Sequence, residues 1–179
     1  MTRVPVAGFP PDLQPPPSAE MAPQPFTPAA IRDAMPPGSH RRFVTRGTAG
    51  TTTIVEWSVL QATEAHCRIR FTLIDDDGTP GAPTEKVVGW EELRDHATFP
   101  AAHTAAVEEE VTVPAGRYLC WTYTVTERSD TDILVSSYSF AKVLPGAPIR
   151  YASIRNGTTE SVTELEYCST VDPQHVPSL

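Results

Sequence analysis

Long apolar runs, clustered cysteines and concentrated positive charge are all missing from this chain of 179 residues. Nothing in it approaches the roughly 20 apolar residues of a membrane-spanning helix. The first residues also lack the apolar run of about 7–15 residues that marks a secretion signal. We therefore expect a soluble protein that is cytoplasmic as written, and periplasmic only if a signal was removed.

Basic residues are too few and too scattered for a nucleic-acid or membrane-surface protein. The chain has 14 Lys and Arg against 22 Asp and Glu, a formal net charge of -8. Phosphate backbones and anionic lipid surfaces both require a concentrated basic footprint. The short pairs Arg41–Arg42 and Arg68/Arg70 are typical of solvent-facing strand positions instead. We predict no nucleic-acid partner.

Only three cysteines are present, Cys67, Cys120 and Cys168, and they lie far apart without a C-x-x-C pair. The odd count argues against a complete disulfide framework, although two neighbouring strands could be bridged in an oxidising compartment. We expect buried free thiols. The acidic run 75–77 lacks the alternating ligand spacing of an EF-hand loop, so we read it as an exposed turn and predict no metal or cofactor.

Catalytic constellations are absent as well. No G-x-S-x-G or H-E-x-x-H motif occurs. Glu92 and His96 would share a helix face, with His103 as a third candidate ligand, but an ion pair or helix cap is the simpler interpretation. Glu164 and Glu166 share a strand face without surroundings that would separate their pKa values. We predict that the protein is not an enzyme.

Proline is the residue that the chain has in excess. Eight of its 19 prolines lie within residues 1–26, which cannot form a regular backbone ladder. We interpret residues 1–26 as a Pro-rich tail or extended strap, 27–170 as a single antiparallel β domain, and 171–179 as a C-terminal tail. Thr27-Pro28 is typical of a helix start, with threonine as N-cap and proline at the first helical position. A second short helix is expected at 90–97.

Strand-like alternation dominates the rest of the chain, with local turns and no βαβ rhythm. In the run 118–125 the stronger core face is predicted to carry Leu119, Trp121, Tyr123 and Val125. Asn156-Gly157 is the strongest hairpin signal. The sequence therefore predicts a mainly β fold with minor α, an antiparallel sheet of about eight strands and one or two short helices. The expected strands are 52–61, 66–74, 85–89, 105–113, 118–125, 133–143, 149–155 and 161–169.

Three phrases give the chain a family likeness: W-E-E-L-R-D-H-A, P-A-G-R-Y-L-C-W-T-Y and F-A-K-V-L-P-G-A-P-I-R-Y. Over Thr27–Cys168 their order resembles bacterial proteins related to the LolA/LppX lipoprotein-carrier superfamily. The resemblance implies a curved half-barrel sheet whose concave face, covered by helices, can hold acyl chains. A secretion signal and a lipobox cysteine are missing, and a Pro-rich tail stands in their place. The implied apolar cavity would be lined by Trp57, Phe71, Trp121, Tyr123, Tyr138 and Phe140.

Two functional hypotheses remain open at this stage. The first is a protein that binds a lipid or other hydrophobic small molecule in the concave face of its sheet. The same six aromatic residues could equally form an ordinary core between sheet and helices. The second is a structural or interaction module without a ligand, which forms a homodimer or docks a partner through a sheet edge or the Pro-rich tail.

Overall fold

The computed structural model describes residues 20–48, 50–75 and 77–169. The predicted tail 171–179 and the first 19 residues of the predicted tail 1–26 lie outside this range. The elements, in chain order, are α1 (Pro28–Ala34), β1 (His40–Gly47), β2 (Thr52–Ala62), β3 (His66–Ile74), β4 (Thr84–Gly89), α2 (Trp90–Asp95), the 3-10 helix η1 (Ala101–His103), β5 (Thr104–Val113), β6 (Gly116–Arg128), β7 (Ile133–Ala141), β8 (Arg150–Arg155) and β9 (Thr158–Ser169).

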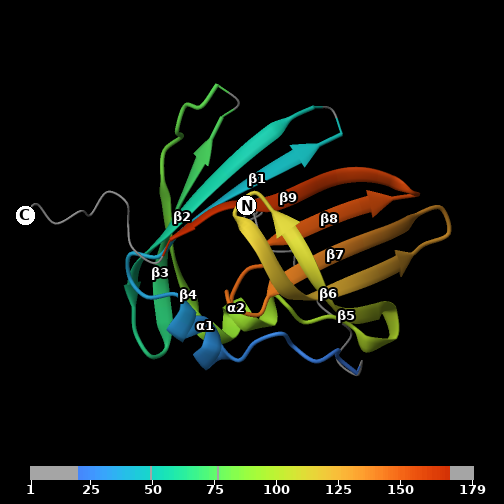
Figure 1. Cartoon of the computed structure of the whole chain (residues 1–179), viewed down its shortest axis with the longest axis horizontal. Helices are drawn as coiled ribbons and strands as arrows, with labels where there is room; N and C mark the ends of the chain where they lie inside the picture. Colours follow the sequence, from blue (N-terminus) through green and yellow to red (C-terminus); the bar gives the residue numbers. More distant parts are fainter. Residues whose placement is uncertain (1–19, 49, 76, 170–179) are drawn as a thin grey trace, which may run out of the picture.

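All nine strands belong to one antiparallel sheet, in the order β4-β3-β2-β1-β9-β8-β7-β6-β5. The chain runs outward from β1 to β4, crosses to the opposite edge through α2 and η1, and returns from β5 to β9 (Figure 1). The first and last strands therefore pair at the centre of the sheet. Because β4 and β5 are the two ends of this order, the sheet is open. The mainly β, antiparallel fold with two short α-helices is confirmed, with nine strands where about eight were expected.

Both helices begin and pack as their residues predict. The Thr27 side chain accepts a hydrogen bond from the Ala30 backbone N–H, which confirms the predicted N-cap of α1. Helix α1 buries Ile31, and Met35 follows it into the core. Helix α2 buries Trp90 and Leu93, so its two apolar residues hold it against the sheet, as expected. Figure 1 shows the two helices side by side.

The buried side chains form two clusters. The helix-side cluster joins Ile31, Met35, Trp90 and Leu93 to sheet residues that include Trp57. The aromatic cluster joins residues of β6 and β7 to residues that precede α1 and η1, namely Ala22, Ala97, Phe99, Tyr123, Val125, Tyr138 and Phe140.

Strand register shows that both clusters lie on the same face of the sheet. Directly opposed residues in neighbouring strands point to one side, as do residues two apart on one strand. Phe43 and Thr45 share a face of β1, and Thr45 lies opposite Thr163. Thr163 lies opposite Tyr151, which in turn faces Tyr138. Helices and N-terminal segment thus cover one continuous face.

The predicted core face of β6 is only half right. Tyr123 and Val125 are buried, but Leu119 and Trp121 are exposed, and Cys120 is buried in their place. The cause is the β5–β6 hairpin, whose end extends past the last residue of β7, Ala141. This end folds onto β9, where the Ala115 N–H donates to the Leu165 carbonyl at 3.1 Å. Contact with β9 therefore buries the opposite face of the first half of β6.

The tightest turn confirms its sequence signal. Asn156 and Gly157 join β8 to β9 with φ values of 50° and 80°, the left-handed conformations that a two-residue hairpin needs. The strand before the Pro145–Pro148 corner ends at Ala141 and not at 143 as expected. Residues 142–149 form a loop between β7 and β8 in which Gly146 has a φ of 126°.

Candidate functional site

Four aromatic side chains of β6, β7 and β8 form a continuous surface on the covered face, and we call this the aromatic floor: Tyr123, Tyr138, Phe140 and Tyr151. The rings of Tyr138 and Tyr151 stack with centroids 4.8 Å apart, and Tyr123 meets Phe140 edge-on at 5.7 Å. Phe99 lies over the floor, stacked on Tyr138 at 4.8 Å. Such geometries stabilise aromatic pairs beyond their buried area.

The phenols of Tyr123 and Tyr138 are neutral hydrogen-bonding groups. Burial raises the pKa of Tyr138 and that of Tyr123 above the ordinary tyrosine value. The Tyr123 hydroxyl donates to the backbone carbonyl of Pro23 at 2.6 Å. Because the Tyr123 phenol is protonated, it can serve as a hydrogen-bond donor to the backbone of an extended segment.

That segment is the strap, residues 20–26, which precedes α1. It forms a short antiparallel ladder with the segment before η1: the Ala22 N–H donates to the Phe99 carbonyl at 2.9 Å, and the Ala101 N–H donates to the Glu20 carbonyl at 2.8 Å. Ala22 is buried, and the Phe26 ring meets Phe140 edge-on at 6.2 Å. The strap therefore closes the aromatic floor without belonging to the sheet.

A buried arginine connects β1 to the Pro-Gly-Ala-Pro corner. Arg41 is only 2% exposed, and its guanidinium lies 5.2 Å from the centre of the Trp57 ring. Its Nη2 donates to the Pro145 carbonyl at 3.1 Å, while its Nη1 has no hydrogen-bond partner among the described residues. Burial lowers the pKa of Arg41, partly offset by Cys168 and Tyr118. Ring and carbonyl dipoles thus hold the corner against the sheet.

An exposed apolar group, which we call the edge patch, adjoins the aromatic floor where Trp121 lies opposite Phe140: Leu119, Trp121 and Val143. Their exposed fractions are 48%, 37% and 73%. The Lys142 N–H donates to the Leu119 carbonyl, which places this corner of the loop beside β6. The Lys142 ammonium sits 3.8 Å from the centre of the Trp121 ring and pairs with Glu108. The edge patch is therefore apolar and is flanked by one positive and one negative side chain, Lys142 and Glu108.

The edge patch adjoins β5, which ends the sheet. Strand β5 pairs with β6 along its whole length, and no other strand among the described residues pairs with its outer side. Six consecutive residues, 105–110, are exposed. Glu108 and Glu109 lie opposite Trp121 and Cys120, so they point to opposite faces, as strand alternation predicts. Glu110 pairs with Arg117 of β6.

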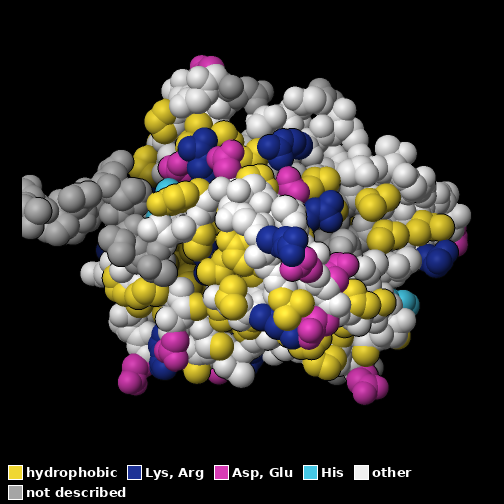
Figure 2. All heavy atoms as spheres, in the orientation of Figure 1, with side chains coloured by type: hydrophobic (Ala, Val, Ile, Leu, Met, Phe, Trp, Pro, Cys, Tyr) yellow, Lys and Arg dark blue, Asp and Glu magenta, His cyan; other side chains and the backbone are white. Residues whose placement is uncertain are grey.

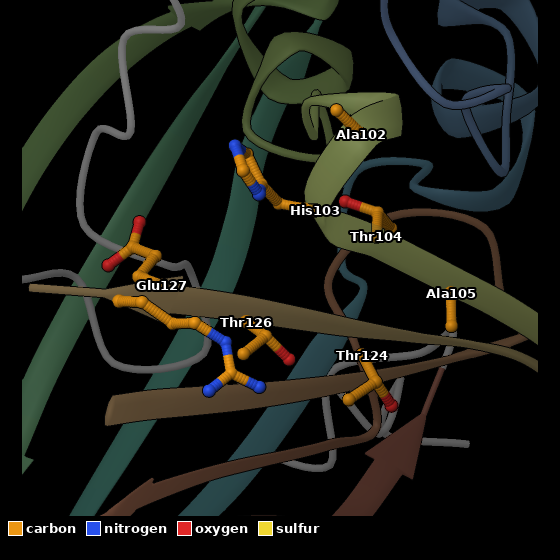
Figure 3. Close-up of a pocket in the computed structure, with 8 residues that line it drawn as sticks. Ala102, His103, Thr104, Ala105, Thr124, Thr126 and Glu127 are labelled. Carbon is orange, nitrogen blue, oxygen red and sulfur yellow. The ribbon is translucent and has the colours of Figure 1, made fainter.

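Two surface clefts lie away from the aromatic floor. The larger, of about 650 Å³, runs between η1 and the end of β6; Figure 3 shows His103 and Glu127 projecting into this region from the two elements. The second, of about 460 Å³, lies beside α1 and α2 and is lined in part by Arg32 and Trp90. Neither cleft is lined by any of the six residues predicted for an apolar cavity.

The six predicted cavity residues fall in three places. Tyr123, Tyr138 and Phe140 meet in the aromatic cluster. Trp57 and Phe71 are cross-strand partners of the helix-side cluster, and Trp121 lies in the edge patch.

The sequence analysis allowed for an extended strap but did not predict that the strap and Phe99 lie over the aromatic floor. Phe99-Pro100 in the sequence indicates only the end of a helix, and the strap has few apolar residues to mark it. A signal was nevertheless present, because Ala22 and Phe26 are the apolar residues that flank Pro23-Gln24-Pro25.

The remaining sequence candidates have structural partners. His96 Nδ1 lies 2.6 Å from the Glu92 carbonyl, a cap of α2. Glu164 and Glu166 pair with arginines of the neighbouring strands. No group of three or more His, Cys, Asp or Glu side chains could hold a metal ion in residues 20–48, 50–75 and 77–169. Figure 2 shows basic and acidic side chains next to each other on the viewed face.

The cysteines are free thiols, as expected. Cys67 and Cys120 are buried and Cys168 is half-buried. Burial raises the pKa of Cys67 to about 11, and likewise that of Cys120. Both stay protonated at neutral pH.

No known family profile matches the sequence, and no curated protein matches it either. Among solved structures, the chain is similar to the crystal structure of MucB in complex with MucA(peri), with a TM-score of 0.53 and 18% sequence identity. The likeness is one of fold. It covers 82% of this chain and 55% of the MucB chain, so this chain spans about half the length of that protein. Among the described residues no helix is long and apolar enough to cross a membrane.

Proposed function

We propose that this protein is a non-catalytic binding module that docks an extended segment of a protein partner along its β5 edge. The observation that carries the proposal is the open edge itself: ten residues long, with six consecutive residues exposed and no strand on its outer side among the described residues. An edge strand presents unpaired backbone donors and acceptors, which an added strand can satisfy.

The charges of β5 favour a basic partner over a second copy of this chain. Glu108, Glu109 and Glu110 are consecutive on β5. Glu108 pairs with Lys142 and Glu110 with Arg117, whereas Glu109 points to the other face. Two copies that paired through β5 would bring these carboxylates together, and like charges on opposed strands destabilise the pairing. A segment that carries Lys or Arg would meet them with complementary charge, which also accelerates association.

The edge patch supplies the apolar part of the docking surface. Trp121 and Leu119 project from β6, the strand next to β5, on the face that Glu108 shares. Tryptophan is enriched among the residues that dominate binding energies at interfaces. MucB, which has a similar fold, was solved in complex with MucA(peri), and this supports a protein partner for the fold.

A labelled peptide that alternates Lys and Val tests this docking. We expect its fluorescence anisotropy to rise on binding and the affinity to fall with added salt. The Glu109→Lys variant should weaken binding about tenfold, which corresponds to roughly 1.4 kcal/mol. Glu64→Lys, in the β2–β3 turn, makes the same change of net charge away from β5 and serves as the control. If both variants bind like the unmodified protein, the edge is not the docking site.

A hydrophobic small molecule or lipid is the second candidate ligand. The observation that favours it is that the aromatic floor is closed partly by a strap and not by a helix alone. Native mass spectrometry of protein purified from its expression host would reveal a retained lipid-sized mass. A ligand-free monomer that also fails to bind a hydrophobic fluorescent probe would reject this candidate.

A further inference from the structure

The strap binds the rest of the protein as a ligand peptide would. Two of its contacts are a backbone ladder, in which the Phe99 carbonyl accepts from Ala22 and the Ala101 N–H donates to Glu20. Such bonds do not depend on the side chains of the bound segment. In a third contact, the Tyr123 hydroxyl donates to the Pro23 carbonyl, so this bond also involves only the backbone of the strap. Any extended segment of suitable spacing can make these three bonds.

Two apolar side chains of the strap act as anchors, and the Gln24 side-chain amide donates to the Thr98 hydroxyl at 2.7 Å. Ala22 is buried in the aromatic cluster, and Phe26 packs against it from four residues further on. Pro23 and Gln24, which lie between the two anchors, are exposed. The Pro23 ring therefore affects docking through the backbone and not through burial. A proline restricts φ and reduces the conformational entropy that the free segment loses on docking. The strap is therefore a small anchor and an aromatic anchor joined by a stiff Pro-Gln-Pro spacer.

The strap can leave without breaking the sheet. It belongs to none of the nine strands of the sheet order, and it precedes α1, whose N-cap bond from Ala30 to Thr27 does not involve it. The segment it contacts, 97–101, is held from its other end by η1 and β5. Departure of residues 20–26 would uncover the Tyr123 hydroxyl, the Phe99 carbonyl and the Ala101 N–H together.

We propose that the aromatic floor is a docking site for an extended, proline-containing segment of a partner protein with a small residue and an aromatic residue four positions apart. The strap occupies this site in the free protein and competes with the partner. Because the strap is tethered, its effective concentration is of the order of millimolar, so a partner segment must exceed that value or match the site better. The site is distinct from the β5 edge.

The test uses the full-length chain and a synthetic peptide of residues 20–26, Glu-Met-Ala-Pro-Gln-Pro-Phe. Ala22→Asp places a charge in the buried anchor position and weakens the strap while the floor stays intact. This variant should bind the labelled peptide at least about tenfold more tightly than the unmodified protein does, because the tethered competitor is removed. A peptide with Phe26 replaced by Ser should bind about tenfold more weakly, and one with both prolines replaced by Ala a few-fold more weakly.

Two tyrosine variants in the Ala22→Asp background locate the binding. Tyr123→Phe removes the hydroxyl that donates to the bound carbonyl and should weaken peptide binding several-fold. Tyr151→Phe removes another hydroxyl of the floor, one that makes no hydrogen bond to the strap among the described residues, and should leave the affinity unchanged. Equal affinities for the native and the Ser- or Ala-substituted peptides, or equal effects of the two tyrosine variants, would overturn the proposal.

The unmodified protein provides a second measurement in case Ala22→Asp does not fold. In NMR titrations with millimolar peptide, amide shifts should be confined to residues 20–26, 97–101 and the floor. Shifts elsewhere, or none, would overturn the assignment. So would binding of laurate in place of the peptide, which would identify a lipid site, or a strap-exchanged dimer that binds no peptide. Because Glu109 lies opposite Cys120 and therefore points to the face away from Tyr123, failure here leaves the β5 experiment unaffected.

Discussion

Replacing Trp57 and Trp121 separately by alanine distinguishes a packed core from a cavity wall. Trp57 is 1% exposed and lies between Phe43, with ring centroids 6.1 Å apart, and the Arg41 guanidinium. Truncation of a buried tryptophan costs about 3–5 kcal/mol. Loss of the desolvated cation–π contact adds about 2 kcal/mol. Because the Trp57 indole N–H has no hydrogen-bond partner among the described residues, its removal returns about 1 kcal/mol. The expected cost for Trp57→Ala is about 4–6 kcal/mol.

Trp121→Ala should cost much less. More than a third of this residue is already in solvent, so truncation leaves no sealed cavity. Its lost burial is worth about 1–2 kcal/mol, and its exposed contact with Lys142 about 0.5–1 kcal/mol. The free energies of unfolding, measured by urea denaturation followed by circular dichroism, should therefore differ by about 3 kcal/mol between the variants.

Two outcomes would refute this reasoning. One is an equal loss of stability in both variants. The other is a Trp57→Ala protein that loses less than about 2 kcal/mol while its binding of a hydrophobic fluorescent probe falls, because the ring would then line a cavity. Trp57→Phe keeps an aromatic ring without the unpaired N–H and should cost only about 1 kcal/mol, so it extends the series if the alanine variant is too unstable.

Three further changes test local features of the fold. Gly146→Ala should cost about 2–3 kcal/mol in urea unfolding, because φ is 126° and an added Cβ would lie 3.3 Å from the Met35 sulfur and 3.4 Å from an Arg41 guanidinium nitrogen. Gly50→Ala is the control: its φ is also positive, but no atom lies within 4 Å of an added Cβ, so it should cost about 1 kcal/mol. Equal costs in the two variants would contradict the close packing of the corner. Burial raises the pKa of Cys67 and Cys120 to about 11 from the ordinary thiol value of 9.0. The stability that depends on keeping these thiols protonated is therefore complete below about pH 9 and is lost as the pH rises toward 11, by up to about 2–3 kcal/mol per thiol. Unfolding free energies at pH 8 and 10.5 should therefore diverge less in Cys120→Ala, and an unchanged difference would argue against a buried thiol. Thr27→Ala removes the N-cap of α1 and should cost about 1 kcal/mol in thermal unfolding, while Thr27→Ser should not; a loss of the same size in both variants would exclude capping as the cause.

Local chemistry was sufficient to predict the elements whose ends are determined nearby. The Thr27 cap and the Asn156-Gly157 turn depend only on adjacent backbone, and both were predicted correctly. The buried face of β2, with Val55, Trp57 and Val59, follows simple alternation because the other side of that strand meets solvent or ion pairs. Alternation could not predict which face of the first half of β6 is buried. That face is determined by a contact with β9, distant in sequence, in which the Ala115 N–H donates to the Leu165 carbonyl.

The candidate site was less accessible to sequence reasoning than the fold. Aromatic residues on strands mark a covered face, but the depth of that cover depends on which segment lies over them. The strap reaches the floor through a ladder between Met21 and Pro100, which no local pattern indicates. Arg41 was interpreted as a solvent-facing residue, whereas it is buried against Trp57, because its neighbour Arg42 takes the outward position.

The pairing of β1 with β9 at the centre of the sheet has a consequence for how the chain folds. Thr45 and Thr163, which share a hydrogen bond across this pair, are 118 residues apart in the sequence. Each outer half of the sheet is built from neighbours in the chain, but the two halves join only at this seam. Such long-range contacts slow folding, typically to milliseconds or longer. On a ribosome, the central seam cannot close until almost the entire chain has emerged, and until then β1 and β8 each carry an unpaired edge.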